Sequence, residues 1–283
     1  MLNGQYFVGV GAQKCGTCWL GEALRSHPDV WFSPLKEVHY FDAHHIPWMD
    51  NVEAKMRAKL EKKTGGATVT DVRDLDGFSE KTKCLAARVA MRSNEDYVRY
   101  FHPAEGRAAF GEITPAYSVL PPKGFQEIRT CFPSARVIFL MRDPVARIWS
   151  SVRYARLRAS DPRHLVEASD LDRFVASRGV VERTRYDRTL TNLFTVFDRE
   201  EVLVDFYETV FESPFSQVQF LRRVCRHIGV AYHDAMAEVT DRKFNASPPA
   251  VMPGDLAQRL RQEFAPVVEG VRRLMGTVPA SWG

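Results

Sequence analysis

The sequence predicts an α/β protein whose parallel central sheet is flanked by helices, as in P-loop-type folds. A short apolar run at residues 6–10 leads through a glycine-bearing loop into a helical pattern over residues 17–26. A second apolar run at residues 135–141 leads in the same way into a helical stretch that continues through Ser150. Continuous apolar runs are typical of parallel strands buried on both faces, and helices form the crossovers between them.

The remaining elements follow the same pattern more weakly. Residues 201–208 (EVLVDFYE) read as a late strand of the sheet, and residues 213–229 read as the helix after it. The chain has 283 residues, no internal repeat and no linker-like stretch, so residues 1–283 are expected to form a single domain.

The first loop has the composition of a phosphate-binding loop. Gly9, Gly11 and Gly16 surround Lys14. Glycines let backbone N–H groups approach an anion, the helix N-terminus offers unpaired donors, and lysine adds a full charge. In a nucleoside-triphosphate loop the lysine directly follows the second glycine, whereas here Thr17 follows Gly16 and the lysine comes two residues earlier. The spacing predicts a 5′-phosphate loop with the transferred group on the Lys14 side and no hydroxyl–magnesium pair.

This spacing resembles the 5′-phosphosulfate loop of the sulfotransferases that use 3′-phosphoadenosine 5′-phosphosulfate (PAPS). In that family an R-[DEN]-P after a strand, with a serine eight residues beyond the arginine, binds the 3′-phosphate; Arg142 and Ser150 match this spacing. The resemblance implies the sulfotransferase fold, with Lys14 also donating to the oxygen that bridges sulfur and phosphorus. The residues it assigns to the donor's 5′ side are Gly11, Gln13, Lys14, Cys15, Gly16, Thr17, Cys18 and Trp19. From the residues alone, two ordinary strand-to-helix turns are the alternative.

Residues 36–42 (KEVHYFD) are similar to the K/R-E-x-H-[FY]-F-D stretch of the heparan-sulfate-type (glucosaminyl) branch. The resemblance makes Glu37 the base that takes the proton of the acceptor hydroxyl, with His39 and Asp42 as supporting groups and His39 as the second candidate base. A hydroxyl needs a proton acceptor in the transition state, and a carboxylate in a partly dehydrated cleft can have its pKa raised towards working pH. The alternative is a solvated Lys36–Glu37 pair beside a core-packed histidine.

Residues 111–117 (GEITPAY) resemble the E-K-[ST]-P-x-Y stretch on the acceptor side of the same branch. The resemblance makes Glu112 and Tyr117, together with Asp42, substrate-side residues, although Ile113 stands where the family has lysine. A plain turn at the end of a strand is the alternative.

One further segment resembles the family's nucleotide-binding residues, and one residue of the first loop departs from them. Lys243, Asn245 and Ser247 resemble the K-x-N-x-S segment that lies near the bound nucleotide in many members, although a surface loop rich in serine and proline would read similarly. Cys18 stands where the family usually has a second threonine. Cysteine is a poor hydrogen-bond donor, so one phosphate contact is expected to be weaker.

The cysteines and histidines predict no metal site. The five cysteines are odd in number and scattered, which fits reduced thiols better than a disulfide framework. Residues 15–18 do form a C-x-x-C, which can be a redox pair, but no second C-x-x-C exists to complete a zinc site, and no H-E-x-x-H occurs.

Charge and hydropathy exclude several classes of protein. The net charge is +4, and Arg142, Arg147, Arg153, Arg156, Arg158 and Arg163 crowd into one helical stretch and the loop after it, where they face either an anionic ligand or solvent. No aromatic-interleaved basic patch or reading-helix motif predicts nucleic-acid binding. No apolar run approaches the roughly 20 residues of a membrane helix, and no signal peptide is evident. A cytoplasmic, bacterial enzyme with no membrane or nucleic-acid partner is expected.

The function that the resemblance implies is in-line sulfuryl transfer from PAPS to a hydroxyl, leaving 3′,5′-adenosine bisphosphate (PAP), with no metal. The acceptor is expected to be a carbohydrate or a glycosylated metabolite, with a small phenol or alcohol as the alternative. Residues 43–106 and 154–180, where the resemblance fades, are expected to shape the acceptor site; the oligomeric state is not readable. A P-loop kinase, which would need magnesium and ATP, and a non-catalytic PAP-binding module remain as other classes.

Overall fold

The five strands form one parallel sheet in the order β2-β3-β1-β4-β5, and every neighbouring pair runs parallel. The computed structural model describes residues 2–49, 51–66, 75–159, 167–240, 242, 244 and 247–283. The strands are β1 (Gln5–Gly11), β2 (Val30–Phe32), β3 (Ala109–Ile113), β4 (Arg136–Met141) and β5 (Val202–Phe206). The predicted α/β fold with a parallel central sheet is therefore confirmed.

Both predicted strand–loop–helix units are present. β1 leads into α1 (Thr17–Ser26), and β4 leads into α7 (Pro144–Arg158). The late strand is shorter than expected, because β5 ends at Phe206 and the chain then forms α11 (Tyr207–Val210).

The carboxylate of Glu208 explains the early end of β5. It accepts hydrogen bonds from the backbone N–H of Asp143 at 2.8 Å and from Trp282 Nε1 at 3.0 Å, which fixes a turn at the edge of the sheet. The helix that follows is α12 (Pro214–His227), close to the predicted bounds.

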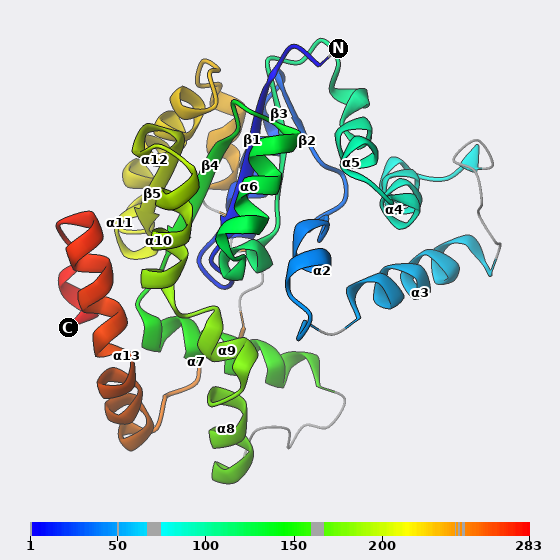
Figure 1. Ribbon diagram of the computed structural model, residues 1–283. Helices are drawn as coiled ribbons and strands as arrows, with labels where there is room; N and C mark the ends of the chain where they lie inside the picture. The colour runs from blue at the N-terminus through cyan, green and yellow to red at the C-terminus, as the bar shows by residue number, and fades with distance from the viewer. Residues whose placement is uncertain are drawn as a thin grey trace.

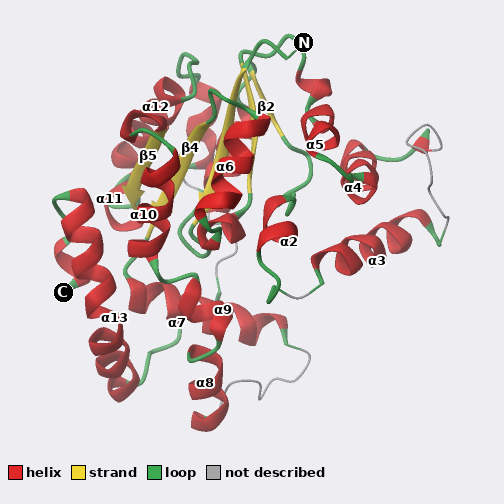
Figure 2. Cartoon of the chain, in the orientation of Figure 1, coloured by secondary structure: helices red, strands yellow, loops and turns green. Residues whose placement is uncertain are grey.

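Helices cover both faces of the sheet (Figures 1 and 2). In the view of Figure 1, α6 and α10 lie in front of the strands, and α10 packs against both α6 and α13. The helices not yet named are α2 (Phe41–His45), α3 (Val52–Thr64), α4 (Glu80–Ala90), α5 (Asn94–Tyr100), α6 (Pro122–Cys131), α8 (Ala168–Val175), α9 (Arg178–Glu182), α10 (Tyr186–Val196) and α13 (Gly254–Met275). Short 3₁₀ turns are η2 (His102–Ala104), η3 (Pro115–Val119), η4 (Arg199–Glu201), η5 (Asp234–Val239) and η6 (Ala280–Trp282).

Aromatic side chains fill the core on one side of β1 and β3. The ring of Tyr6 stacks on Phe132 with the ring centroids 3.8 Å apart, and Phe101 meets Tyr6 edge-on at 5.4 Å. Strands β1 and β3 approach closely at Gly111, where a Cβ atom would lie 1.9 Å from the carbonyl oxygen of Phe7. Only glycine fits there, so this position fixes the spacing of β1 and β3.

The carboxyl ends of the parallel strands share one edge of the sheet, and α7 and α9 lie beyond this edge (Figure 1). In open parallel sheets this edge is where ligands bind. None of the described helices combines the length and the apolar character needed to cross a bilayer.

Candidate functional site

The loop between β1 and α1 presents a helix N-terminus to a cavity. Gly16 is the N-cap of α1 with a φ of 87°, and a Cβ atom there would lie 2.7 Å from the Phe211 ring. No side chain caps α1, and its first turn carries no acidic residue. The first N–H groups of the helix are therefore available to an anion.

This loop forms one wall of a cavity of about 530 Å³, which we call the loop cavity. From the loop and the start of α1 it is lined by Gln13, Lys14, Gly16, Thr17, Cys18 and Trp19. All six of these residues are among those predicted from the sequence. Gly11 and Cys15, which were also predicted, are not among the lining residues.

The junction between β4 and α7 forms the facing wall, with Arg142 and Ser150 on it. Arg142 donates to the carbonyl oxygen of Lys14 at 3.3 Å, and its guanidinium lies over the Tyr207 ring, 4.3 Å from the centroid. The Nε of Arg142 is buried without a hydrogen-bond partner among the described residues. The two junctions predicted from sequence thus meet at one cavity, tied by a direct hydrogen bond.

A third wall comes from the segment before α13. Arg242 and Phe244 line the cavity together with Ser247, and the hydroxyl of Ser247 is buried with no partner among the described residues. Lys243 and Asn245, the other residues of the predicted K-x-N-x-S segment, lie outside the described residues.

Positive charge is concentrated around Lys14. Its ammonium lies 4.1 Å from the centroid of the Tyr154 ring. Burial is the main cause that lowers the pKa of Lys14, and the nearby cations Arg142, Lys36 and Arg153 lower it further, against the opposing effect of Cys18. An anion bound here would relieve this crowding of like charges, so the cavity suits a phosphate or sulfate group.

Glu37 lies in the wall of the loop cavity and belongs to a chain of charged groups. Its carboxylate is 3.2 Å from His39 Nε2 and 3.5 Å from Lys36 Nζ. On the other side of the imidazole, His39 Nδ1 is 2.6 Å from Asp42 Oδ2. The imidazole is therefore held between two carboxylates, and only Glu37 of the two reaches the cavity.

The protonation of this chain differs from the sequence-based expectation. Burial opposes the charged form of His39, but its hydrogen bonds to Asp42 and Glu37 outweigh burial and raise the pKa of His39 to about 9. Burial likewise works against the Glu37 carboxylate, yet the hydrogen bond from His39 and the charge of Lys36 leave the pKa of Glu37 lowered. We expected a raised pKa for Glu37; the structure instead keeps it ionised and His39 protonated at neutral pH.

Asp42, Glu112 and Tyr117, which we expected on the substrate side, are 0% exposed and lie behind the cavity wall. Glu112 accepts hydrogen bonds from the backbone N–H of Val38 at 3.1 Å and from the hydroxyls of Thr114, Tyr97 and Tyr117 at 2.5, 2.8 and 2.9 Å. Burial raises the pKa of Glu112 in spite of these bonds.

The segment that carries Glu37 is anchored through this buried cluster. Tyr117 also receives the N–H of Tyr40 at 3.0 Å, and Thr114 receives that of His39 at 3.4 Å. Glu112 and Tyr117 therefore fix the backbone that follows Glu37, at Val38 and Tyr40.

The departure at Ile113 and the burial of Cys15 have a structural explanation. Ile113 is 4% exposed and packs beside Gly9, where a Cβ atom would lie 2.5 Å from its side chain, so this position faces the core. Cys15 is fully buried near the hydroxyl of Tyr186, and burial raises the pKa of its thiol to about 12. None of the five cysteines forms a disulfide, and the raised pKa of the buried Cys15 thiol argues against Cys15 and Cys18 as a redox pair.

Sequence reasoning missed most of the aromatic and C-terminal lining of the loop cavity. The additional lining residues are Lys36, Pro115, Arg153, Tyr154, Tyr207, Phe211, Gln217, Thr240, Arg242 and Phe244. Of these additional residues, only Arg153 belongs to the basic stretch of α7 that the sequence pointed to. Arg147 from the same stretch is fully buried and donates to Val180 and Thr184. Arg163 lies outside the described residues.

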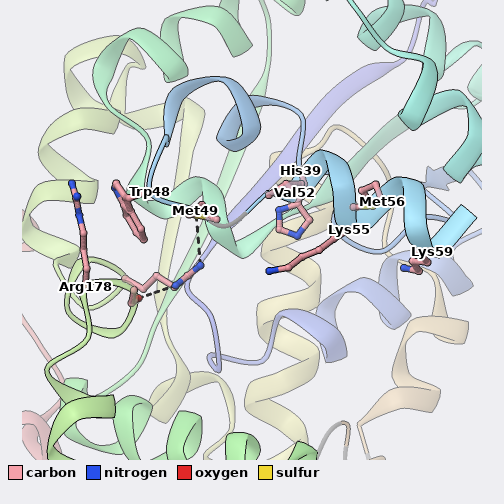
Figure 3. Close-up of a pocket in the computed structure, with 10 residues that line it drawn as sticks. His39, Trp48, Met49, Val52, Lys55, Met56, Lys59 and Arg178 are labelled. Atoms are coloured by element: carbon pink, nitrogen blue, oxygen red, sulfur yellow. Dashed lines mark hydrogen bonds between the residues drawn. The ribbon is translucent and has the colours of Figure 1, made fainter.

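A second cavity of about 520 Å³, which we call the side cavity, lies between α3 and α9. Its lining residues are His39, Trp48, Met49, Val52, Lys55, Met56, Lys59, Arg178, Gly179 and Arg183 (Figure 3). These residues belong to the segments 43–106 and 154–180, or lie just beyond them, with the exception of His39. Since His39 bonds Glu37, the two cavities meet at this pair of side chains.

The described residues contain no group of three or more histidine, cysteine, aspartate or glutamate side chains that could hold a metal ion. The positive charges available at the loop cavity are those of its cationic side chains and of the α1 N-terminus.

Comparison with protein families and curated proteins gives consistent results. A model described as the sulfotransferase family matches residues 7–234. Human carbohydrate sulfotransferase 15 is 26% identical over 230 residues, which cover 76% of this chain and 39% of that protein, and the mouse protein of the same name matches to the same extent. The chain thus spans about two fifths of the length of these relatives.

Solved structures show the same fold. A sulfotransferase from Alicyclobacillus acidocaldarius has a TM-score of 0.65 at 24% identity, covering 100% of this chain and 99% of that one. A mouse sulfotransferase complexed with PAP has a TM-score of 0.50 at 13% identity, with 97% and 89% covered.

Proposed function

Because the chain belongs to the sulfotransferase family, we propose that it transfers a sulfuryl group from PAPS to a hydroxyl group of an acceptor. One observation carries this proposal: both strand-to-helix junctions of the predicted phosphate sites open onto the same cavity, and Glu37 lies in its wall. The mouse structure with a TM-score of 0.50 was solved with PAP, which supports a donor of this kind.

The residues of the loop cavity fit an adenosine bisphosphate group. Arg142 Nε and Ser247 Oγ are buried without partners among the described residues, and the α1 N-terminus has no acidic residue in its first turn. In the proposed arrangement Lys14 and the N-terminal turn of α1 hold the 5′-phosphosulfate, while Arg142 and Ser150 hold the 3′-phosphate. When bound, PAPS supplies an activated sulfuryl group and a stable leaving group.

Glu37 is the proposed general base. Its lowered pKa keeps the carboxylate ready to accept a proton, whereas His39 at a pKa of about 9 already carries one. The acceptor oxygen would form its bond to sulfur while its proton moves to Glu37 and the bond between sulfur and the bridging phosphate oxygen breaks. Lys14 would stabilise the charge that develops on this leaving oxygen. His39 acts through Glu37, since its two ring nitrogens are engaged by Glu37 and Asp42.

The proposed acceptor is a carbohydrate or a glycosylated metabolite. The matching curated relatives are named carbohydrate sulfotransferases, which supports this class of acceptor, although the chain covers only 39% of their length. A small phenol or alcohol is the alternative. A single domain that comprises residues 1–283 is part of the same proposal.

The proposal is tested by calorimetric titration of PAP, without added metal, into the wild type and the Arg142→Ala variant. We expect saturable binding to the wild type that is weakened at least about tenfold by the loss of this charge-assisted contact. Arg173→Ala, which removes an arginine with an 80% exposed side chain on α8, is the matched control and should bind like the wild type.

Failure of the wild type to bind PAP would overturn the donor assignment. Magnesium-dependent ATP turnover in the same preparation would then favour a P-loop kinase. PAP binding without transfer to any hydroxyl, and without an effect of Glu37→Gln on any reaction, would favour a non-catalytic binding module.

A further inference from the structure

Among the described residues, the side cavity is lined by several cations and by no carboxylate. Lys55, Lys59 and Arg178 contribute their charges from α3 and α9, and Arg183 contributes a fourth at the C-terminal end of α9. In Figure 3 the ammonium of Lys55 extends from α3 towards the Met49 side of the cavity. The carboxylates of Asp42 and Glu37 contact His39, but neither lines the cavity.

Arg183 is the most distinctive of the four, because its guanidinium contacts only weak or neutral acceptors among the described residues. Its guanidinium donates to the carbonyl oxygen of Gly179 at 2.9 Å and to the Sδ atom of Met49 at 3.6 Å, and it forms no ion pair with a described residue. Burial is the main cause that lowers the pKa of Arg183, and the charge of Arg147 adds to it, against the opposing charges of Asp42 and Glu37. A thioether is a weak acceptor, so a stronger one would replace it readily.

Lys59 is in a similar electrostatic position on α3. Burial lowers its pKa, and the neighbouring lysines Lys81 and Lys63 lower it further. An anion in the side cavity would stabilise the charged forms of both Lys59 and Arg183.

The remaining lining is apolar and includes a large aromatic surface. The guanidinium of Arg178 lies 4.9 Å from the centroid of the Trp48 ring, which keeps that ring at the cavity wall (Figure 3). Met49, Val52 and Met56 complete the apolar part. A ring with an apolar face, such as a sugar or an aryl group, can pack here while an attached anion reaches the cations.

We infer that the side cavity binds the acceptor by an anionic group, a carboxylate or a sulfate, on the same molecule as the reacting hydroxyl. The inference rests on the proposed function, because it makes the hydroxyl approach Glu37 from the side of His39. An acidic sugar and a hydroxylated aryl acid share the chemistry that the cavity recognises. Neutral alcohols lack the group that Lys59, Arg178 and Arg183 would bind.

Binding of matched acid and neutral ligands tests the inference. The titrations use protein saturated with PAP and two pairs of probes: a glucuronate-containing tetrasaccharide with its carboxyl-reduced form, and 4-hydroxyphenylacetate with its amide. At least one acid should bind about tenfold or more tightly than its neutral partner. The pair in which this difference occurs identifies the source of the anion as a sugar or an aryl acid.

Charge reversal on the cavity wall provides the second arm. Lys59→Glu and Arg178→Glu should each weaken binding of the preferred acid about tenfold, and leave the neutral partner and PAP unaffected. The control is Lys62→Glu, an exposed lysine on the same helix that does not line the cavity, and it should bind all probes like the wild type. Arg183 is left intact because its guanidinium also holds Gly179 and Met49 together.

The inference is overturned if neither acid binds, if the neutral partners bind as tightly, or if both reversals leave acid binding unchanged. If the protein still binds PAP, any one of these outcomes overturns only the assignment of the acceptor. Loss of PAP binding in the wild type would instead remove the proposed function itself.

Discussion

His39 should make the stability of the protein depend on pH in a window set by its raised pKa. The perturbation is His39→Gln, which keeps a hydrogen-bonding side chain but removes the titrating imidazole. The pKa of His39 rises from 6.5 to about 9 in the folded protein. At 1.36 kcal/mol per pKa unit, this rise corresponds to about 3 kcal/mol of stabilisation of the protonated, folded state.

The sign follows from which state holds the proton more tightly. The folded state holds it more tightly. The stabilisation that His39 provides is therefore fully present below the unfolded pKa of 6.5 and is lost as the pH rises through about 9. Because the side chain of His39 is only 20% exposed, solvent screens its interactions with Glu37 and Asp42 only weakly. The stability advantage of the wild type over His39→Gln should therefore shrink by about 3 kcal/mol between these pH values.

Equilibrium urea unfolding at pH about 6, 8 and 10 measures this difference directly. His102→Gln, which removes an exposed histidine, is the matched control and should follow the wild type at each pH. Parallel stability curves for the wild type and His39→Gln would refute the reasoning. The imidazole would then not be held protonated between two carboxylates, and the argument for Glu37 over His39 as the base would lose its basis.

Three further predictions concern the site and its support. Lys14→Ala should reduce sulfuryl-transfer turnover by a factor of about 10²–10³, the usual loss for one donor at a developing charge, and a rate near that of the wild type would remove Lys14 from the mechanism. Glu37→Gln should leave PAP affinity unchanged in calorimetry and lower turnover by a factor of about 10²–10⁴, whereas a full rate would make His39 the candidate base. Glu112→Ala should lower the free energy of unfolding in urea by about 3 kcal/mol or more, because four buried donors lose their acceptor; an unchanged midpoint would contradict the role of this cluster.

The sequence predicted the parts of the site that depend on local backbone geometry. The loop at residues 12–16 and the junction at Arg142 each follow a buried strand, and parallel strands bring such junctions to one edge of the sheet. The fold class and the convergence of the two junctions could therefore be predicted without knowledge of the tertiary structure. The single domain, the bacterial origin and the cytoplasmic location stay predictions.

The properties that the sequence could not give depend on contacts between distant segments. The side cavity joins α3 to α9, which lie more than 100 residues apart and share no motif. The expected pKa of Glu37 had the wrong direction, because burial was considered without the proton that Asp42 keeps on His39. Glu112 and Tyr117 were assigned by position in a motif, while their role depends on a cluster that includes Tyr97 from α5.

Backbone strain gives an independent reason to place the chemistry at Lys14, Glu37 and His39. Among the described residues, these are the three non-glycine residues with a left-handed backbone conformation, and their φ values are 69°, 62° and 56°. Each such position costs of the order of 1–3 kcal/mol, and a glycine would avoid most of the cost. Their side chains make up the cation at the loop cavity, the carboxylate in its wall and the imidazole that joins the two cavities. The strained backbone therefore occurs at positions where the proposed reaction needs a specific side chain, although glycine would form the turn at a lower energetic cost.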